Sequence, residues 1–540
     1  MDMLCKFQDT LPKIGVILIF CVAGVFLFFN LDGHYLWKDE AETALLGRSI
    51  LEKGLPSAFL GKNQIHIHLK EFLRSDGIWT FHPWLPFYVT AGSFRVLGES
   101  TISARLPFAI LGFLALIATY FLALQLSRSK LCAWFSVVFL TCSIPFMLHM
   151  RECRYYAPAA LFSVLMILGY IRFFQFKKYT APFFVIISNL LFHSNYGIFL
   201  PIQMALILHA FIFYRREPKF KSFLAIEGLV FMMTFPWFVY FNGFQHSSHV
   251  FGWKHLSHHL QYYFRLTYKF IFPVFFVVGL YFYQLIGKKK EFIFTFLQKL
   301  ERESMGLLGM ILLVSYAFVI LGDQRFYRYV IHLVPIYMIL LAMIFTGWFR
   351  SQKWVASVFF LFMIGTNVFY YSLPFLVLKV IPEGIVGQFL SLEALNQLKT
   401  KQAKIYFSPV SQYVDELTHP ADDMNQKLAA FFLKRANQND AIGIAYSDHS
   451  LMFYTDFKII NLYFEKEQYP EWIVFQPEWF EEIYGPLHQS SYVKKMKTDY
   501  DAMVTDIADH RWGQRPDPYE HAFRSEISVP RIVIYRKKKG

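Results

Sequence analysis

Apolar stretches of about 20 residues recur along the first 375 residues of this 540-residue chain, and they limit the folds open to it. A helix needs ~20 apolar residues to cross the ~30 Å hydrocarbon core of a membrane. Hydrophobic residues make up 55% of the sequence and charged residues 17%, whereas an ordinary soluble domain carries about 25% charge. The sequence therefore predicts a polytopic, all-α membrane protein.

We expect about eleven transmembrane helices. They begin at Ile14, Leu106, Leu131, Tyr156, Ala181, Ile198, Ser222, Phe270, Met305, Val330 and Trp354. Residues 181–214 are apolar almost throughout, and one helix of that length would measure roughly 50 Å, too long for a single crossing. His193-Ser194-Asn195-Tyr196-Gly197 and Pro201 interrupt this stretch, so we predict two helices joined by a tight hairpin.

Lysine and arginine are distributed unequally between the loops that alternate along the chain. Eighteen of them, from Lys6 to Lys353, fall on one side of the predicted bundle, and seven fall in the short loops on the other side. Because basic loops stay in the cytoplasm, the N-terminus is expected there. The net charge of +14 is explained by this topology, so we do not expect a nucleic-acid partner.

Two regions outside the spans fall on the extracytoplasmic side. Within the first outer loop, 31–105, the stretch from His82 to Leu97 contains two prolines and Arg95, and we expect it to lie along the membrane interface. After the membrane domain, 1–382, the segment 383–540 is more charged. It contains strand-like runs at 404–407, 442–446, 472–475 and 531–535 and a helical stretch at 425–437, so we predict a small α/β domain.

Acidic residues follow the first span directly. Asp39 and Glu40 are adjacent, and on a short helix Asp39 and Glu42 would share a face. Neighbouring carboxylates beside a membrane can accept a proton or hold a polar group. Acids at a helix N-terminus are also favoured by the helix dipole alone, so a purely structural role is the alternative.

Arginine pairs stand in two other outer loops. Arg151 and Arg154, with Tyr155, open the fourth span; they are one turn apart, and they could clamp a phosphate or pair with the acids across the site. Arg325 and Arg328 run against the charge bias of their side, which suits a lipid phosphate or pyrophosphate. Anchoring of helix ends at the interface is the alternative for both pairs.

Histidines are the last candidates. His193 and Tyr196 occupy the predicted hairpin tip, where a hydrogen-bonded structural histidine is the commoner case. His66, His68 and His82 lack the spacing of a metal motif, and we assign no metal ligands.

Taken together, these motifs resemble the GT-C superfamily of membrane glycosyltransferases, and within it the bacterial branch similar to dolichyl-phosphate-mannose–protein mannosyltransferases and lipid A aminoarabinose transferases. The resemblance covers roughly residues 10–375. It rests on Asp39-Glu40, His82-Pro83-Trp84-Leu85-Pro86, Glu99, Ala104-Arg105-Leu106-Pro107, Arg151-Glu152-Cys153-Arg154-Tyr155-Tyr156, His193–Tyr196, Arg328-Tyr329 and Pro335. At His82-Pro83-Trp84 the chain departs from the family, in which a second proline is usual.

The resemblance implies a multi-pass glycosyltransferase of a bacterial inner membrane. Its donor would be a polyprenyl-phosphate-linked sugar, and its acceptor a lipid, glycan or protein reached from the extracytoplasmic side. Asp39 would be the general base, supported by Glu40, in an inverting single displacement. Contacts to the donor phosphate or the acceptor would come from His82, Arg151, Arg154, Tyr155, His193, Tyr196, Arg325 and Arg328. The resemblance leaves a divalent metal open, because members of the superfamily differ in this respect.

Two other functions compete with this prediction. A transporter or flippase for a lipid-linked sugar would place ionisable residues near mid-span and break its helices in symmetric halves. The sequence shows few mid-span charges and no internal repeat. The other alternative is an inactive membrane protein that binds a partner, against which the intact pair Asp39-Glu40 argues.

Overall fold

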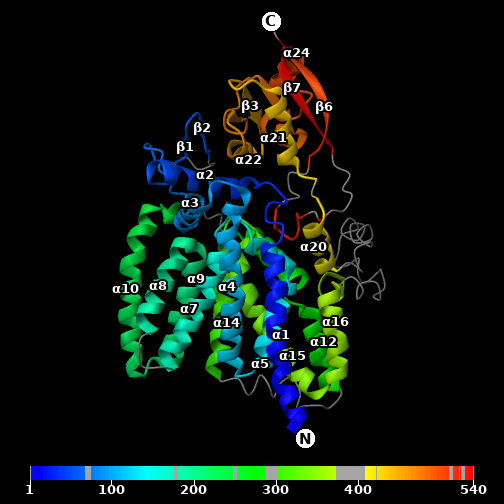
Figure 1. The fold of residues 1–540 in the computed structure, drawn as a ribbon. Coiled ribbons are helices and arrows are strands. Elements are labelled where there is room, and N and C mark those ends of the chain that lie inside the picture. Colours follow the sequence, from blue (N-terminus) through cyan, green and yellow to red (C-terminus); the bar gives the residue numbers. More distant parts are fainter. Residues whose placement is uncertain are drawn as a thin grey trace.

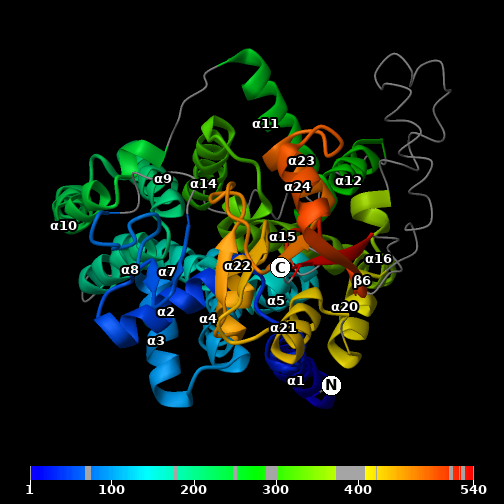
Figure 2. The ribbon, with the colours of Figure 1, turned by 90° about the horizontal axis from the view of Figure 1, so that it is seen from above.

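The computed structural model describes residues 2–66, 74–175, 180–246, 252–286, 302–372, 408–420, 422–509, 515–521, 523 and 530–538. A bundle of helices forms one end of the molecule and an α/β region the other (Figure 1). The N-terminus emerges from the far end of the bundle, and the C-terminus leaves the top of the α/β region. Seen from above, the α/β region covers the middle of the bundle and leaves α8 (Thr180–Ser194) and α10 (Pro218–Tyr240) uncovered (Figure 2).

By length and composition, six of the described helices could span a membrane, and up to eight could if each of two bent pairs counts as one span. The six are Thr101–Ser127 (α4), Tyr156–Gln175 (α7), Tyr196–Tyr214 (α9), Pro218–Tyr240 (α10), Glu303–Leu321 (within α14, Arg302–Leu321) and Tyr327–Ser351 (η4, Tyr327–Leu333, with α15, Val334–Ser351). Three shorter apolar helices are Ile14–Phe28 (within α1, Asp2–Phe28), Thr180–Ser194 (α8) and Lys353–Gly365 (α16). The described apolar helices thus form a multi-pass membrane bundle, and the count of about eleven spans stays a prediction.

The two bent pairs differ from the straight spans that hydropathy predicts. Lys130–Cys142 (α5) meets Ile144–Met150 (α6) at 77°. Trp253–Ile271, which joins α11 (Trp253–Leu266) to η3 (Thr267–Ile271), meets α12 (Val274–Ile286) at the same angle. Pro145 follows the first break by one residue of α6, and Pro273 lies within the second break. Since proline lacks the amide donor that continues a helix, it favours such breaks.

The hairpin predicted at 193–197 is confirmed. Helix α8 ends at Ser194 and α9 begins at Tyr196. Asn195 between them has an extended backbone, and its side chain accepts a hydrogen bond from the amide of Ile198. This N-cap satisfies an amide that the first turn of α9 leaves without a helical partner.

Contacts between predicted cytoplasmic loops support the sidedness of the spans. Arg350 Nη2 donates to Ser129 Oγ at 3.2 Å, Lys219 donates to the carbonyl of Phe174, and Tyr214 donates to Glu303. Each of these contacts joins the ends of helices that the charge pattern assigns to the same side. These contacts agree with the predicted grouping of the helix ends, and the side of the membrane on which they lie stays a prediction.

The opposite end of the bundle carries the first outer loop. Helices α2 (Lys38–Lys53) and α3 (Leu85–Leu97) lie there, between the bundle and the α/β region, with a small hairpin of β1 (Phe59–Leu60) and β2 (Asn63–Gln64) (Figure 1). Helix α3 is not among the candidate spans of the described chain. This agrees with the prediction that residues 82–97 do not cross the membrane.

A five-stranded mixed sheet forms the core of the α/β region, in the order β4-β3-β5-β7-β6. Its strands are β3 (Ala441–Ile444), β4 (Lys458–Asn461), β5 (Trp472–Phe475), β6 (Tyr500–Ala508) and β7 (Arg531–Lys537). The first three neighbours are parallel, and β7 runs antiparallel to both β5 and β6. Helices α21 (Met424–Arg435), α22 (Asp448–Tyr454), α23 (Pro477–Tyr484) and α24 (Ser491–Asp499) accompany the sheet, whereas α20 (Pro409–Thr418) lies against α16 and α6 of the bundle.

Three of the four predicted strands are confirmed as β3, β5 and β7, and α21 matches the predicted helix at 425–437. The predicted strand at 404–407 lies outside the described residues. Strands β4 and β6 are additions that the sequence did not predict. The boundary at 383 also lies outside the described residues and stays a prediction.

Helix α22 packs on the segment that leads into α2. Ser450 Oγ donates to the carbonyl of Leu36 at 2.7 Å, and Tyr454 Oη accepts from the amide of Leu36 at 2.9 Å. The ring of Tyr454 also stacks on Tyr35 at a centroid distance of 3.6 Å. Residues more than 400 positions away along the chain therefore fix the backbone just before Asp39.

Candidate active site

Asp39 lies in the first turn of α2, at the outer end of the bundle. Its Oδ2 accepts a hydrogen bond from Arg328 Nη1 at 2.9 Å, and both side chains keep 19% of their surface exposed. The positive end of the helix dipole adds to the stabilisation of the carboxylate. The structure thus joins an outer-loop acid to an outer-loop arginine, and both are residues that the sequence singled out.

Opposing influences set the pKa of Asp39. Burial alone would raise it, but the guanidinium groups of Arg154 and Arg328, with smaller contributions from Arg515 and Lys38, bring the pKa below the usual range of aspartate. Asp39 is therefore a carboxylate at neutral pH. It is a weak base while its arginine partners remain in place.

Arg154 connects Asp39 with Glu42. Its Nη1 donates to Glu42 Oε1 at 2.8 Å, to Thr43 Oγ1 at 2.9 Å and to the carbonyl of Asp39 at 3.1 Å. Asp39 and Glu42 thus share a helix face, as predicted, and Arg154 lies against that face. The Arg154 Nε is buried and has no hydrogen-bond partner among the described residues.

Glu40 points away from this face and is fully buried. Arg105 donates to it twice, from Nε at 2.8 Å and from Nη2 at 2.5 Å, and the amide of Cys153 donates at 2.9 Å. Arg105 Nη1 also donates to the carbonyls of Leu31 and His34. A bidentate pair of this kind fixes geometry as well as charge. Glu40 is therefore held as an anchor of α2, and its predicted support of Asp39 in catalysis stays a prediction.

Arg151 does not join Arg154, which corrects the expectation of a two-arginine clamp. Residues 151–155 form turns rather than a helix, so the spacing of one helical turn does not apply. Arg151 instead donates to the carbonyls of Phe26, Phe29 and Asn30 and to the hydroxyl of Tyr413. It satisfies carbonyls that the end of α1 leaves without helical partners.

His82 and Tyr155 lie beside Glu42. His82 Nδ1 is 4.0 Å from Glu42 Oε1, and its ring lies 6.5 Å from the ring of Tyr155 at an interplanar angle of 28°. Both residues therefore border the face of α2 that carries Asp39. Contact of either residue with a ligand stays a prediction.

Three other predicted ligand residues lie in different surroundings. The ring of His193 packs on Trp237 at 5.3 Å, and that of Tyr196 packs on Phe238 at 5.5 Å, so both belong to an aromatic cluster along α10. Arg325 is exposed and lies over the ring of Tyr262 in α11. These contacts do not bring the three residues next to Asp39, and their role in ligand binding stays a prediction.

Several residues at the site were missed by sequence reasoning. Lys38 Nζ lies 3.5 Å from Asp448 Oδ1 and 4.9 Å from the ring centroid of Tyr446, and Arg515 lies over Trp37. Arg105 was named in the motif Ala104-Arg105-Leu106-Pro107 but was given no role at the site, although an arginine beside an apolar stretch needs a buried partner. The C-terminal residues had no local signal in the sequence, because their approach to α2 depends on tertiary structure alone.

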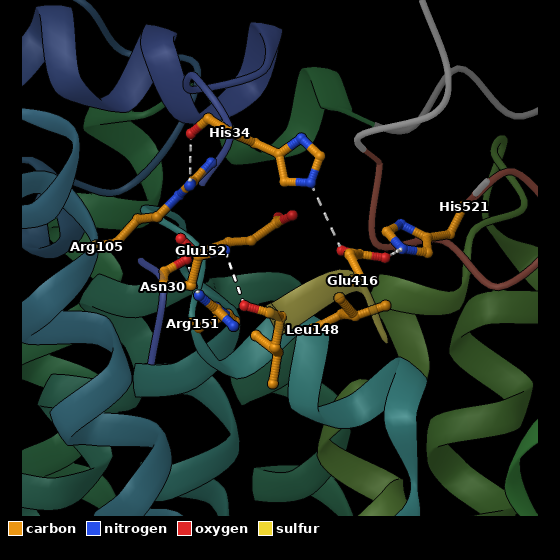
Figure 3. A pocket seen from close by; sticks show the side chains of 9 residues that line it. Asn30, His34, Arg105, Leu148, Arg151, Glu152, Glu416 and His521 are labelled. Atoms are coloured by element: carbon orange, nitrogen blue, oxygen red, sulfur yellow. Dashed lines mark hydrogen bonds and ion pairs between the residues drawn. The ribbon is translucent and has the colours of Figure 1, made fainter. Parts of the chain in front are cut away.

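A cavity of about 50 Å³ lies beside Arg105 and Glu152 (Figure 3). It is lined by Asn30, His34, Arg105, Leu148, Arg151, Glu152, Glu416, Leu417 and His521. Burial, reinforced by the neighbouring Glu40, raises the pKa of Glu152 well above its usual range. Glu416 Oε2 lies 2.8 Å from His521 Nε2, and Glu416 Oε1 lies 3.8 Å from His34 Nε2. This chain of groups ties α20 to the segment around His521.

A larger cavity of about 380 Å³ opens where the two bent helix pairs meet α16 and α20. Most of its wall is apolar, from residues such as Phe139, Ile271 and Met363, while Lys269 and Glu520 add charge. Leu148 and His521 line both cavities. The combination of an apolar wall and a charged rim suits an amphiphile.

The Glu416–His521 pair predicts a pH-dependent stability. Burial lowers the pKa of His521, but the carboxylate of Glu416 outweighs burial and raises it above the usual value. Burial raises the pKa of Glu416, and His521 brings it below the usual value. The contribution of His521 to the free energy of unfolding is thus complete below pH ~6.5, and it is lost as the pH rises through the raised pKa of His521. The contribution of Glu416 to the free energy of unfolding is present above pH ~4.3, and it is lost as the pH falls through the lowered pKa of Glu416.

We therefore expect His521→Gln to lower the Tm most between about pH 4.5 and 6.5, with a smaller loss at pH 9. The control is His419→Gln, which removes an exposed ion pair between His419, the C-cap residue of α20, and Asp415 in α20. This variant should change the Tm little at any pH. Thermal unfolding of both variants across this pH range checks the prediction. A Tm loss that is independent of pH would contradict it.

Among the described residues, no group of three or more histidine, cysteine or acidic side chains is arranged to hold a metal ion. The carboxylates around Asp39 instead have arginine and lysine partners. The chemistry that this chain's own described residues offer is proton acceptance beside a cluster of guanidinium groups.

No protein-family model matches the chain, and no curated protein matches its sequence. Solved structures do match. The crystal structure of ArnT from Cupriavidus metallidurans bound to undecaprenyl phosphate aligns with a TM-score of 0.56 at 14% identity, over 96% of this chain and 97% of that one. The same protein in the apo state aligns with a TM-score of 0.53 at 13% identity, over 98% of each chain. This chain has the GT-C fold, as its motifs predicted.

Proposed function

We propose that this chain is an integral membrane glycosyltransferase that transfers a sugar from a polyprenyl-phosphate-linked donor to an acceptor on the extracytoplasmic side. The observation that carries the proposal is the pair Asp39–Arg328, with an O···N distance of 2.9 Å, at the outer end of a GT-C bundle. The similar ArnT structure contains undecaprenyl phosphate. The positive-inside distribution of the loops supports an extracytoplasmic site.

The charges at the site suit the departure of a phosphate. In the transfer, the oxygen of the acceptor forms a bond to the anomeric carbon, and the bond from that carbon to the phosphate oxygen breaks. The electron pair stays with the polyprenyl phosphate, which gains negative charge as it leaves. A guanidinium positioned where this charge develops stabilises the transition state more than the ground state. Arg328 would supply that guanidinium.

Asp39 would accept the proton of the acceptor hydroxyl in the same step. Its pKa is held low in part by Arg328, which makes it a weak base in the free protein. When the donor phosphate binds Arg328, it partly neutralises the positive charge of that guanidinium, and the pKa of Asp39 rises. Donor binding would thus prepare the base, and attack opposite the leaving phosphate would invert the anomeric centre.

The other polar residues would hold this geometry. Glu40 and Arg105 anchor α2, so that Asp39 stays paired with Arg328. Arg154 holds Glu42 on the same helix face, beside His82 and Tyr155. These residues would line the site for the sugar or the acceptor hydroxyl.

The experiment is a comparison of membrane glycolipids and glycoproteins by mass spectrometry in a strain that lacks the gene. Complementation with the wild-type chain should restore one or more glycan additions, and Asp39→Asn, produced at the same level, should not. An identical glycan profile with and without the gene, or full restoration by Asp39→Asn, would refute the proposal.

A further inference from the structure

The turn between α6 and α7 contacts α2 on one side and borders a cavity on the other. On the side of α2, the amide of Cys153 donates to Glu40 at 2.9 Å, and Arg154 Nη1 donates to the carbonyl of Asp39 at 3.1 Å. On the other side, Glu152 lines the cavity of about 50 Å³. This turn therefore joins the part of α2 that carries Asp39 to a polar cavity.

Glu152 is the buried acid of this cavity. Its side chain extends toward the space between the ring of His34 and the carboxylate of Glu416 (Figure 3). Glu152 is only 7% exposed, and its Oε2 is buried with no hydrogen-bond partner among the described residues. Burial, reinforced by Glu40, raises the pKa of Glu152 well above its usual range, so the side chain carries a proton at neutral pH. A buried polar atom without a partner costs stability, which points to a role in the reaction or to bound water.

The charged and titratable groups around Glu152 come from several elements. They are Glu40 of α2, Arg105 of α4, Arg151 of the same turn, Glu416 of α20, and the imidazoles of His34 and His521.

His34 connects the cavity to solvent. Its Nδ1 is buried with no hydrogen-bond partner in the described part of the chain, while its side chain as a whole keeps 30% of its surface exposed. Burial brings the pKa of His34 below its usual range, so the imidazole is neutral at pH 7. A neutral imidazole can accept a proton at one nitrogen and release one from the other.

Tyr156 links the cavity side to Asp39. It is fully buried at the start of α7, and its hydroxyl has no hydrogen-bond partner among the residues that the structure describes. Asp39, Arg328 and Glu152 all act electrostatically on this hydroxyl. A phenol can accept a proton at its oxygen while it donates its own. The two acids therefore share a neighbour through which a proton can pass.

The cavity is large and polar enough to hold water. A cavity needs roughly 10–15 Å³ for one water molecule, together with two to four polar partners. The volume of about 50 Å³ exceeds this need, and Asn30 and Arg151 add polar groups to those of Glu152 and His34. Water in the cavity would join Glu152 to His34 by hydrogen bonds.

We propose that Glu152 carries the proton of the acceptor hydroxyl away from Asp39 and through this cavity to solvent at His34. This inference rests on the proposed function and adds a step that follows the transfer of the sugar. When the polyprenyl phosphate leaves, Arg328 pairs with Asp39 again and the pKa of Asp39 falls, so the proton has to leave the carboxyl.

The proton passes from Asp39 by way of the Tyr156 hydroxyl to one oxygen of Glu152. Glu152 releases the proton that it already held to water in the cavity. His34 takes up a proton from that water and gives one to solvent. Each of these groups ends as it began, and Asp39 is again a carboxylate that can serve as the base in the next transfer.

The test follows sugar transfer by the full-length chain in proteoliposomes, with the undecaprenyl-phosphate-linked sugar that the wild type consumes and with membrane extract as the acceptor. Glu152→Gln and Tyr156→Phe keep the shape of each side chain but remove its exchangeable acidic proton. Glu227→Gln is the matched control. Glu227 of α10 is also 7% exposed, and both of its carboxylate oxygens are buried without a hydrogen-bond partner among the described residues. It does not line the cavity.

We expect Glu152→Gln to lower the steady-state rate by about 10-fold or more, while the rate of a single turnover stays within a few fold of the wild type. The transfer of the proton to Asp39 is untouched in this variant, and only the recovery of the base is slowed. Formate or azide should restore the steady-state rate, because a small weak acid can carry the proton through the cavity. A merely structural defect would not respond to either of them.

Tyr156→Phe should show the same difference between steady state and single turnover, with a smaller loss because water can replace the hydroxyl. Glu227→Gln should keep both wild-type rates, with or without formate. If Glu152→Gln does not fold, the same two rates of Tyr156→Phe decide the question.

The outcomes separate the two proposals. If the wild type transfers sugar from none of the donors, the proposed function fails and the path through Glu152 is overturned with it. If the wild type is active and Asp39→Asn is not, but Glu152→Gln keeps the wild-type steady-state rate, the proton leaves Asp39 directly and only the role of Glu152 is refuted. An equal loss in both rates that formate does not restore would give Glu152 a structural role and would also refute the path.

Discussion

Asp39→Asn should lower the rate of sugar transfer from a polyprenyl-phosphate donor by roughly 10²- to 10⁴-fold, the usual contribution of a general base. Asparagine has nearly the same shape and can still accept from Arg328, but it cannot take the proton of the acceptor hydroxyl. The measurement is formation of free undecaprenyl phosphate in proteoliposomes supplied with a panel of undecaprenyl-phosphate-linked sugars and membrane extract as the source of acceptor.

Asp32→Asn is the matched control, because Asp32 is an exposed acid in the same outer segment. It should retain the wild-type rate. Asp39→Asn should still give a monodisperse protein with a cooperative thermal transition, which separates loss of chemistry from loss of fold. A rate for Asp39→Asn within a few fold of the wild type would remove Asp39 from the base role.

Arg105→Met should destabilise the chain more than any surface change, by about 3–5 kcal/mol. The substitution leaves the carboxylate of Glu40, which is fully buried, without the guanidinium that donates to it twice. It also leaves the carbonyls of Leu31 and His34 without their donor. Thermal or denaturant unfolding in detergent measures the loss, and transfer activity should fall with it because α2 is no longer anchored.

Two further variants test the cause of that loss. Adding Glu40→Gln to Arg105→Met removes the unpaired charge, so the double variant should be more stable than Arg105→Met alone. Arg48→Met breaks a pair with Glu99 that is partly exposed, and the lost ion pair should cost about 1 kcal/mol or less. Equal losses for Arg105→Met and Arg48→Met would mean that the buried pair does not anchor α2.

The membrane bundle could be predicted from sequence because a bilayer imposes one length and one composition on every span. The predicted starts at Leu131, Ala181 and Trp354 are each one residue from the observed helix starts. The bends after Cys142 and Ile271 were not predicted, because hydropathy measures length and polarity rather than direction. Proline near each break was the available signal.

In the α/β region, prediction succeeded for strands with continuous apolar runs. Strand β5 has three buried residues in succession, and it was found at its observed bounds. Strand β6 is at the edge of the sheet, most of its middle residues are at least partly exposed, and its sequence therefore lacks a clear apolar pattern. Strand β4 contains only two apolar residues, Ile459 and Ile460, between Lys458 and Asn461, so it lacks a continuous apolar run.

In the candidate site too, local relations could be predicted from sequence and long-range contacts could not. Asp39 and Glu42 were placed on one helix face because their spacing is local, and the structure confirms it. The pairing of Arg151 with Arg154 failed because that spacing has meaning only on a helix. The approach of Arg515 to Trp37 joins residues at opposite ends of the chain, and no local pattern encodes such a contact.

In the proposed function, the phosphate of a polyprenyl donor binds at Arg328, beside Asp39. Photo-crosslinking locates this phosphate, with an undecaprenyl phosphate analogue that carries a diazirine next to the phosphate and with the labelled peptides identified by mass spectrometry. We expect crosslinks in the peptides that contain Phe326–Tyr329 or Trp37–Thr43, and their loss when unlabelled undecaprenyl phosphate is in excess. Crosslinks confined to the aromatic cluster of His193 and Trp237 along α10 would contradict it.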